Sequence, residues 1–175
     1  MDLTADAEAA KRTGGMLALY PTPESAERLL VNHPNAEPIE DLHLTLAYMG
    51  EDVSGYYSPA MADEIAYRLS EEFPPIQAKV MGHATFNPDG EEPCAVHLVG
   101  DNDYLPDLYI VGQTLLHANY DLPRQHTPWI PHVTGGYDMT AADLSYTGPI
   151  EFDMIAVTWG SELYVHHFTP PLGLY

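Results

Sequence analysis

Short apolar runs alternate with helical patterns along the chain. Runs that end at Pro, Gly or turn residues predict strands at residues 16–20, 42–49, 76–86, 94–99 and 132–137. Apolar residues at helical spacing predict helices at residues 22–31, 58–73 and 104–120. Two further runs, 150–159 and 162–168, predict a closing hairpin. The pattern therefore indicates a fold that mixes helices and strands.

The order strand–helix–strand occurs twice, at residues 16–49 and 94–137. In both copies a His-x-Thr stands at the start of the second strand. Because the linker between the copies is short, we expect two lobes that share one sheet system. Residues 1–14 show no usable apolar period, which predicts a flexible tail before a single bilobal domain at 15–175.

The two His-x-Thr segments read HLTLAYMG and PHVTGGYD. Alternate residues of a strand share a face, so His43 and Thr45 point one way. The same alternation places Leu44, Leu46 and Tyr48 on the opposite face, toward the core. By the same rule, His132 and Thr134 share a face of the second strand.

Two such strands facing each other bring two imidazoles and two hydroxyls around one point, which suits a phosphodiester. One imidazole can take a proton from attacking water, and the other, protonated, can donate to the leaving sugar oxygen. The threonine hydroxyls can hold the non-bridging oxygens. This chemistry needs no metal and no cofactor.

His-x-Thr also occurs at residues 83–85 and 167–169. His83 stands near the end of a long predicted strand, and His167 stands just before Pro170 and Pro171. Neither belongs to a repeated strand–helix–strand unit. We therefore expect a structural or surface role for both and a position outside the centre of the cleft.

The paired motifs resemble the His-apolar-Thr signatures of the 2H phosphoesterase superfamily, the LigT-like or 2′-5′ RNA ligase group. The resemblance covers most of residues 15–170. It implies an α+β fold of two pseudo-symmetric lobes of antiparallel sheet, with outer helices around a central cleft. It also implies a metal-independent phosphodiesterase acting on 2′,3′-cyclic or 2′-5′ linkages. In that reading His43 and His132 are catalytic, and Thr45 and Thr134 bind phosphate.

The second motif departs from the family pattern. Gly135 and Gly136 replace an apolar residue and its neighbour, which suits a cleft that needs close backbone approach. Tyr137 stands where many relatives carry Arg or Tyr, and a missing Arg weakens phosphate binding. Small cyclic nucleotides, cyclic oligonucleotide signals or ADP-ribose cyclic phosphate therefore fit better than large RNA. Some viral members of this superfamily degrade host signalling nucleotides, so the resemblance also includes that role among those expected here.

Further candidates for substrate contact surround the motifs. Tyr20 is placed to stack on a base or to pack in the core, and Arg124 is placed to touch phosphate or solvent. We expect Trp129 and Trp159 either to stack on a substrate base or to pack in the core. Glu162 orients a catalytic histidine or is a surface carboxylate. Two alternatives from other classes stay open: a non-catalytic module that binds or sequesters a nucleotide, and a virion-associated interaction protein.

Composition limits the partners. The chain has 175 residues, the size of one domain, with 6 Lys and Arg against 26 Asp and Glu and a formal net charge of −20. Binding of long nucleic acid or of an anionic membrane needs a basic surface, so the sequence argues against both. A small nucleotide remains compatible because a pocket can be locally neutral inside an acidic shell.

The single cysteine, Cys94, excludes an intrachain disulfide and a cysteine-rich zinc site. No apolar run reaches membrane-spanning length, and the N-terminal residues lack a basic leader followed by an apolar stretch. We therefore expect a soluble, cytoplasmic monomer.

Overall fold

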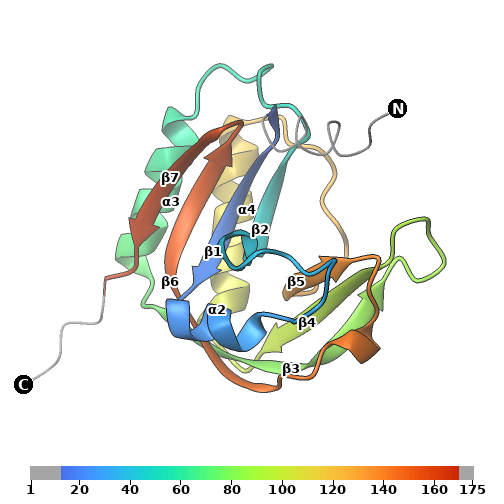
Figure 1. Ribbon diagram of the computed structural model, residues 1–175. Helices are drawn as coiled ribbons and strands as arrows, with labels where there is room; N and C mark the ends of the chain where they lie inside the picture. The colour runs from blue at the N-terminus through green and yellow to red at the C-terminus, as the bar shows by residue number, and fades with distance from the viewer. Residues whose placement is uncertain (1–12, 170–175) are drawn as a thin grey trace, which may run out of the picture.

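The computed structural model describes residues 13–169, and it contains every helix and strand that the sequence predicts (Figure 1). In chain order these are β1 (Gly15–Pro21), α2 (Pro23–Leu29), β2 (Leu44–Gly50), α3 (Ala60–Glu72), β3 (Ile76–Phe86), β4 (Cys94–Gly100), α4 (Tyr104–Asn119), β5 (His132–Tyr137), β6 (Gly148–Trp159) and β7 (Glu162–His167). Short 3₁₀ turns lie at Ile39–Asp41 and Ala141–Asp143. None of the helices in this part of the chain combines the length and apolar character needed to cross a membrane.

The strands form one antiparallel sheet in the order β2-β1-β6-β3-β4-β5, and β7 pairs with β6. β6 joins the two halves of the sheet. Its first residues pair with β3 and its last residues with β7, while β1 runs along its other edge. One lobe is therefore β2-β1-β6-β7 and the other is β6-β3-β4-β5, as expected of two lobes sharing one sheet system.

The two edge strands of this order, β2 and β5, approach each other. They are not paired by hydrogen bonds, yet their Cα atoms come within 8 Å. The sheet must therefore bend around β6, so that its two ends face one another. Both His-x-Thr motifs lie on these two strands or directly before them.

Each copy of strand–helix–strand sends its helix to the other lobe. α2 follows β1, but its last carbonyl, at Leu29, accepts a hydrogen bond of 3.1 Å from Nε2 of His97 on β4. α4 follows β4, but its Gln113 donates to the carbonyl of Leu46 on β2 at 2.8 Å. Figure 1 accordingly shows α3 and α4 behind the sheet of β7, β6, β1 and β2, and α2 on the other side.

Buried apolar side chains form one main cluster that draws on both lobes. It includes Leu17 and Leu69 from the first lobe, Val99 and Val133 from the second, and Phe152 from β6. A continuous core of this kind resists separation of the lobes. Whether residues 15–175 form a single domain stays a prediction.

The predicted tail lies mostly outside the described residues. Its last two residues, Thr13 and Gly14, belong to the folded part. The carbonyl of Thr13 accepts from the amide of Val53 at 2.8 Å, and the carbonyl of Gly14 accepts from the amide of Gly160 at 2.8 Å.

Candidate active site

The two motifs occupy matching positions in the two lobes. On the first lobe, Thr45 pairs with Ala18 and Tyr48 pairs with Met16. On the second lobe, Thr134 pairs with Val96 and Tyr137 pairs with Cys94. The registers of β2 on β1 and of β5 on β4 are therefore the same, although only His, Thr and Tyr are shared by the two sequences.

Each register contains an irregularity at the same place. One extra residue, Leu46 on β2 and Gly135 on β5, interrupts the pairing directly after the threonine. A bulge shifts the alternation by one residue, so the residue three positions after the threonine returns to the threonine's face. Tyr48 is accordingly 39% exposed and lines the cavity described below, and Tyr137 is 44% exposed. The prediction that Tyr48 points to the core is wrong, because simple alternation takes no account of the bulge.

The imidazoles of the two motifs are held in the same way. Nδ1 of His43 lies 2.6 Å from the carbonyl oxygen of Asp41, and Nδ1 of His132 lies 2.7 Å from that of Ile130. A carbonyl only accepts, so Nδ1 carries the proton and Nε2 is the basic nitrogen of each neutral ring. The other two His-x-Thr segments lack this bond. His83, for example, uses Nε2 to bind the carbonyl of Tyr146 at 2.8 Å.

Both threonine hydroxyls contact sulfur. Oγ1 of Thr45 donates to Sδ of Met16, and Oγ1 of Thr134 accepts from Sγ of Cys94, each at 3.8 Å. Sulfur is a weak hydrogen-bond partner, so an oxyanion can displace it at little cost. Both hydroxyls are therefore suited to a phosphate oxygen.

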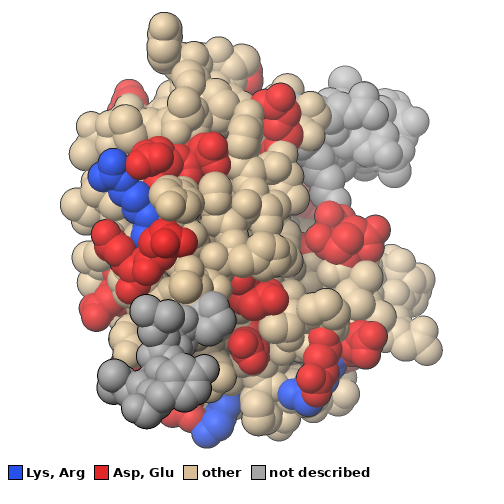
Figure 2. Space-filling view, turned by 90° about the vertical axis from the view of Figure 1, so that its left-hand side faces the viewer, with Lys and Arg blue, Asp and Glu red and all other residues tan. Residues whose placement is uncertain are grey.

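A cavity of about 550 Å³ opens where β2 and β5 approach, and Thr45 and His132 line it. This volume is within the range of small-molecule sites. Its other walls come from β2, the end of β3, α4 and the 121–131 loop: Leu46, Tyr48, Phe86, Asn87, Tyr109, Gln113, Gln125, His126, Thr127, Pro128, Trp129 and Ile130. Within residues 13–169 no Asp, Glu, Lys or Arg lines the cavity, although the chain carries a net charge of −20. On the face shown in Figure 2, acidic side chains are spread widely and basic ones are few.

The 121–131 loop is fastened to β2 along this cavity. The amide of Gln125 bonds both backbone groups of Tyr48, at 2.9 Å and 2.8 Å, as a neighbouring strand would. The indole of Trp129 donates to the carbonyl of Thr45 at 3.3 Å and stacks on Tyr109, with ring centroids 4.0 Å apart. The loop therefore forms a fixed aromatic wall beside the first motif.

Burial changes the acidity of the groups in the site. It lowers the pKa of His132; the hydrogen bond to Ile130 opposes this change, and the charge of His126 adds to it. Burial, with negative charge nearby, raises the pKa of Tyr137 to about 12. Near neutral pH, His132 is therefore biased toward its neutral, basic form and Tyr137 keeps its hydroxyl proton.

Three of the further candidates lie near the motifs. The ring of Tyr20 is 5.9 Å from that of His43, Trp129 lines the cavity, and Tyr137 follows Thr134 on β5. Arg124 is exposed and is not part of the cavity lining.

Two others lie elsewhere. Trp159 and Glu162 line a second, smaller cavity at the turn between β6 and β7. Trp159 packs on the core, with its ring 5.8 Å from that of Tyr56. The exposed carboxylate of Glu162 accepts from the hydroxyl of Tyr164, which matches the alternative of a surface carboxylate.

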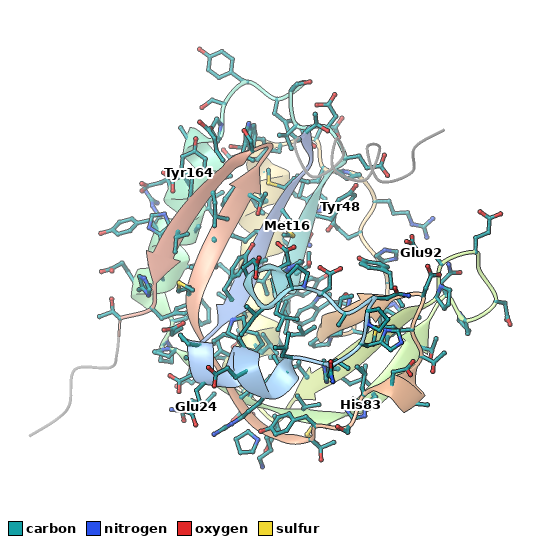
Figure 3. All side chains as sticks on the ribbon, viewed as in Figure 1. Met16, Glu24, Tyr48, His83, Glu92 and Tyr164 are labelled. Carbon is teal, nitrogen blue, oxygen red and sulfur yellow. The ribbon has the colours of Figure 1, made fainter. Side chains whose placement is uncertain are left out.

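Of the four predicted motif residues, Thr45 and His132 line the cavity, whereas His43 and Thr134 do not. The two remaining His-x-Thr histidines lie outside the lining as well, and their surroundings differ from those of the motifs. His83 stacks edge-on with His97 at 5.4 Å, and Figure 3 shows it in the lower lobe, away from Met16 and Tyr48. His167 is exposed on β7, opposite Met154.

The backbone of residues 35–37 packs directly against the glycines of the second motif. The loop before β2 crosses them, with a hydrogen bond of 2.9 Å from the amide of Glu37 to the carbonyl of Gly135 and a bridge between Ala36 and Gly136. A side chain at Gly136 would strike the carbonyl of Asn35. The close backbone approach expected there therefore comes from residues 35–37.

Sequence reasoning missed several residues of the cavity, among them Tyr48, Gln125 and His126. One signal for Tyr48 was present, because both segments read His-x-Thr-x-x-Tyr. The loop residues carry no such spacing, and only the path of the chain brings them to the site.

The strands and helices form an α+β fold of two antiparallel lobes, and this fold is similar to those of several solved structures. TT0787 of Thermus thermophilus is similar with a TM-score of 0.63 and 15% identity, over 91% of this chain and 100% of that one. LigT of E. coli, complexed with 3′-AMP, is similar with a TM-score of 0.58 and 15% identity, over 90% of this chain and 95% of that one. Usb1 of Kluyveromyces marxianus is similar with a TM-score of 0.51 and 13% identity, over 89% of this chain and 98% of that one. No protein-family model and no curated sequence matches the chain. At such low identity the comparisons establish the shared fold.

Proposed function

We propose that this protein is a metal-independent phosphodiesterase that acts on a small cyclic or 2′-5′-linked nucleotide through His43 and His132. The observation that carries the proposal is the matching hydrogen bond from Nδ1 of each ring to the carbonyl two residues earlier. This bond leaves Nε2 as the nitrogen that exchanges protons in both rings. One of these imidazoles lies directly before β2 and the other at the start of β5, and the two strands approach each other. Two imidazoles held in the same way suit acid–base catalysis on one phosphate.

In the hydrolysis of a 2′,3′-cyclic phosphate, water attacks phosphorus and a new P–O bond forms as Nε2 of one ring takes the water proton. The bond from phosphorus to one ribose oxygen breaks, and that oxygen takes a proton from the other, protonated ring. We assign the base to His132, because burial favours its neutral form. Thr45 and Thr134 donate to the non-bridging oxygens.

The cavity beside the motifs supports a nucleotide substrate. Its aromatic wall of Trp129 and Tyr109 offers a stacking surface for a base, and the amides of Gln113 and Gln125 border it. LigT and Usb1 share the fold, and a LigT structure is described as a complex with 3′-AMP. Both the cavity and these similar structures therefore lead us to expect a small nucleotide ligand.

Metal independence follows from the two-imidazole chemistry. Within residues 13–169 no group of three or more His, Cys, Asp and Glu side chains is arranged to hold a metal ion. Turnover should persist in excess EDTA, and a loss that only a divalent ion restores would refute the mechanism.

The test is a turnover panel of 2′,3′-cyclic mononucleotides, 2′-5′ dinucleotides, cyclic di- and trinucleotides and ADP-ribose cyclic phosphate. His43→Ala and His132→Ala should each lower kcat by about 10²- to 10⁴-fold. His167→Ala is the matched control, because it removes an exposed histidine of the same His-x-Thr pattern. An equal loss in that control would contradict the assignment. Tight binding without turnover would support a sequestering module.

A further inference from the structure

Among residues 13–169, no Lys or Arg lines the cavity of the candidate site. The residues that line its cavity carry no acidic and no fixed basic side chain, and the surrounding chain has a net charge of −20. A field of that sign repels a phosphate. Within residues 13–169, the lining groups that can supply an offsetting positive charge are those able to take a proton.

Two imidazoles line the cavity, those of His132 and His126. They come from different segments, β5 and the 121–131 loop, and they lie close enough for the charge of His126 to oppose protonation of His132. The other titratable groups of the lining are Tyr48 from β2 and Tyr109 from α4. A phenol has no positively charged form, so these two side chains supply no positive charge.

The loop presents His126 to the cavity. The residue before it, Gln125, is bonded to the edge of β2, and Trp129 three residues later is stacked on α4. These two anchors fix the path of the loop on both sides of His126. Within residues 13–169 the imidazole of His126 makes no hydrogen bond, and it is exposed. An anchored but unbonded imidazole at the cavity mouth can therefore turn toward an anion.

We propose that His126 is the cationic phosphate-binding residue of this site, and that it does the work that an arginine or lysine would otherwise do. This inference rests on the proposed function, since it concerns the same cavity. Protonated His126 donates to a non-bridging oxygen, while His43 and His132 carry out proton transfer. Because two positive charges side by side are unfavourable, a charged His126 also keeps His132 in its neutral form.

Direct binding tests the proposal without relying on turnover. The probes are adenosine 3′-monophosphate and adenosine, measured by calorimetry at pH 6 and pH 8. His126→Gln should weaken binding of the nucleotide about tenfold at pH 6 and leave binding of the nucleoside unchanged, as expected for one charged hydrogen bond at an exposed position. His126→Arg should retain nucleotide binding and make it less dependent on pH than binding to the native protein.

Arg124→Gln is the matched control, because it removes a fixed charge from the same loop at a position outside the cavity lining. It should change nucleotide binding less than twofold. A second readout is the NMR titration of His132, whose pKa should rise in His126→Gln and stay unchanged in Arg124→Gln. The same NMR spectra will establish whether each variant is folded.

The inference would be overturned if His126→Gln and Arg124→Gln weakened nucleotide binding equally, or if His126→Gln weakened binding of adenosine as much as that of the nucleotide. It would also be overturned if the nucleotide did not bind to the native protein. Its failure differs from failure of the proposed function. Turnover that is insensitive to His126→Gln would refute only the inference. Nucleotide binding that depends on His126, with no turnover across the panel, would refute only the catalytic proposal.

Discussion

Replacing Gly136 with Ala should destabilise the protein by pushing β5 away from the loop that crosses it. The added methyl carbon would lie 3.0 Å from Cα of Ala36 and closer still to the carbonyl oxygen of Asn35. These are backbone atoms, so no side-chain rotation relieves the clash. Inserting one carbon into a packed site costs about 1–3 kcal/mol. We expect the upper part of this range because the bridge between Ala36 and Gly136 must also open.

A second strand glycine provides the control. Gly82 on β3 has no heavy atom within 4 Å of an added methyl carbon. Gly82→Ala should therefore be neutral or up to about 1 kcal/mol more stable, because alanine has fewer conformations in the unfolded chain. For a domain of this size, a loss of about 2–3 kcal/mol lowers Tm by roughly 4–12 °C.

Thermal unfolding by circular dichroism and urea unfolding measure both variants. The reasoning predicts a large loss for Gly136→Ala and little change for Gly82→Ala. A Gly136→Ala protein with the native Tm would show that the loop at residues 35–37 does not press on β5. Equal losses in both variants would show that glycine matters here for backbone freedom and not for space.

Other outcomes follow from the site and the core. Thr45→Ala and Thr134→Ala should each lower kcat about 10- to 100-fold, less than the histidine variants, because each removes one hydrogen bond to a charged group. Turnover should show a bell-shaped pH profile, with its acid limb below the usual pKa of histidine because burial lowers the pKa of His132. Burial also lowers the pKa of His97 to about 4, so this imidazole binds a proton more tightly in the unfolded chain than in the folded protein. The free energy of unfolding, measured by urea titration, should therefore fall by about 3 kcal/mol between pH 6.5 and pH 4. A flat stability curve over that interval, with carboxylate effects subtracted, would contradict the burial of a neutral His97.

The sequence predicts the elements well because their signals are local. Apolar runs and Pro or Gly stops suffice to locate every strand, with shifts of one or two residues at the ends. The faces of Thr45 and Leu44 also follow from alternation alone. The face of Tyr48 does not, since the bulge at Leu46 depends on pairing with β1.

The rest of the site depends on contacts between distant segments. Gln125 reaches Tyr48 across 77 positions of the chain, and Trp129 reaches Thr45 across 84. No periodicity within either segment encodes such a contact. The paired histidines are visible in the sequence because they repeat, whereas the wall of the cavity has no second copy to reveal it.

The exchange of α2 and α4 between the lobes has a consequence for how the chain acquires its structure. Neither lobe is a continuous stretch of sequence, because each needs a helix from the other copy of the repeat and part of β6. During synthesis, β1 and β2 leave the ribosome long before β6, which must pair between β1 and β3. Contacts between such distant segments slow folding, since the loops that separate them must close first. A fragment ending before residue 148 would therefore lack the strand that joins the lobes, and the two edge strands that carry the histidines would have nothing to hold them face to face.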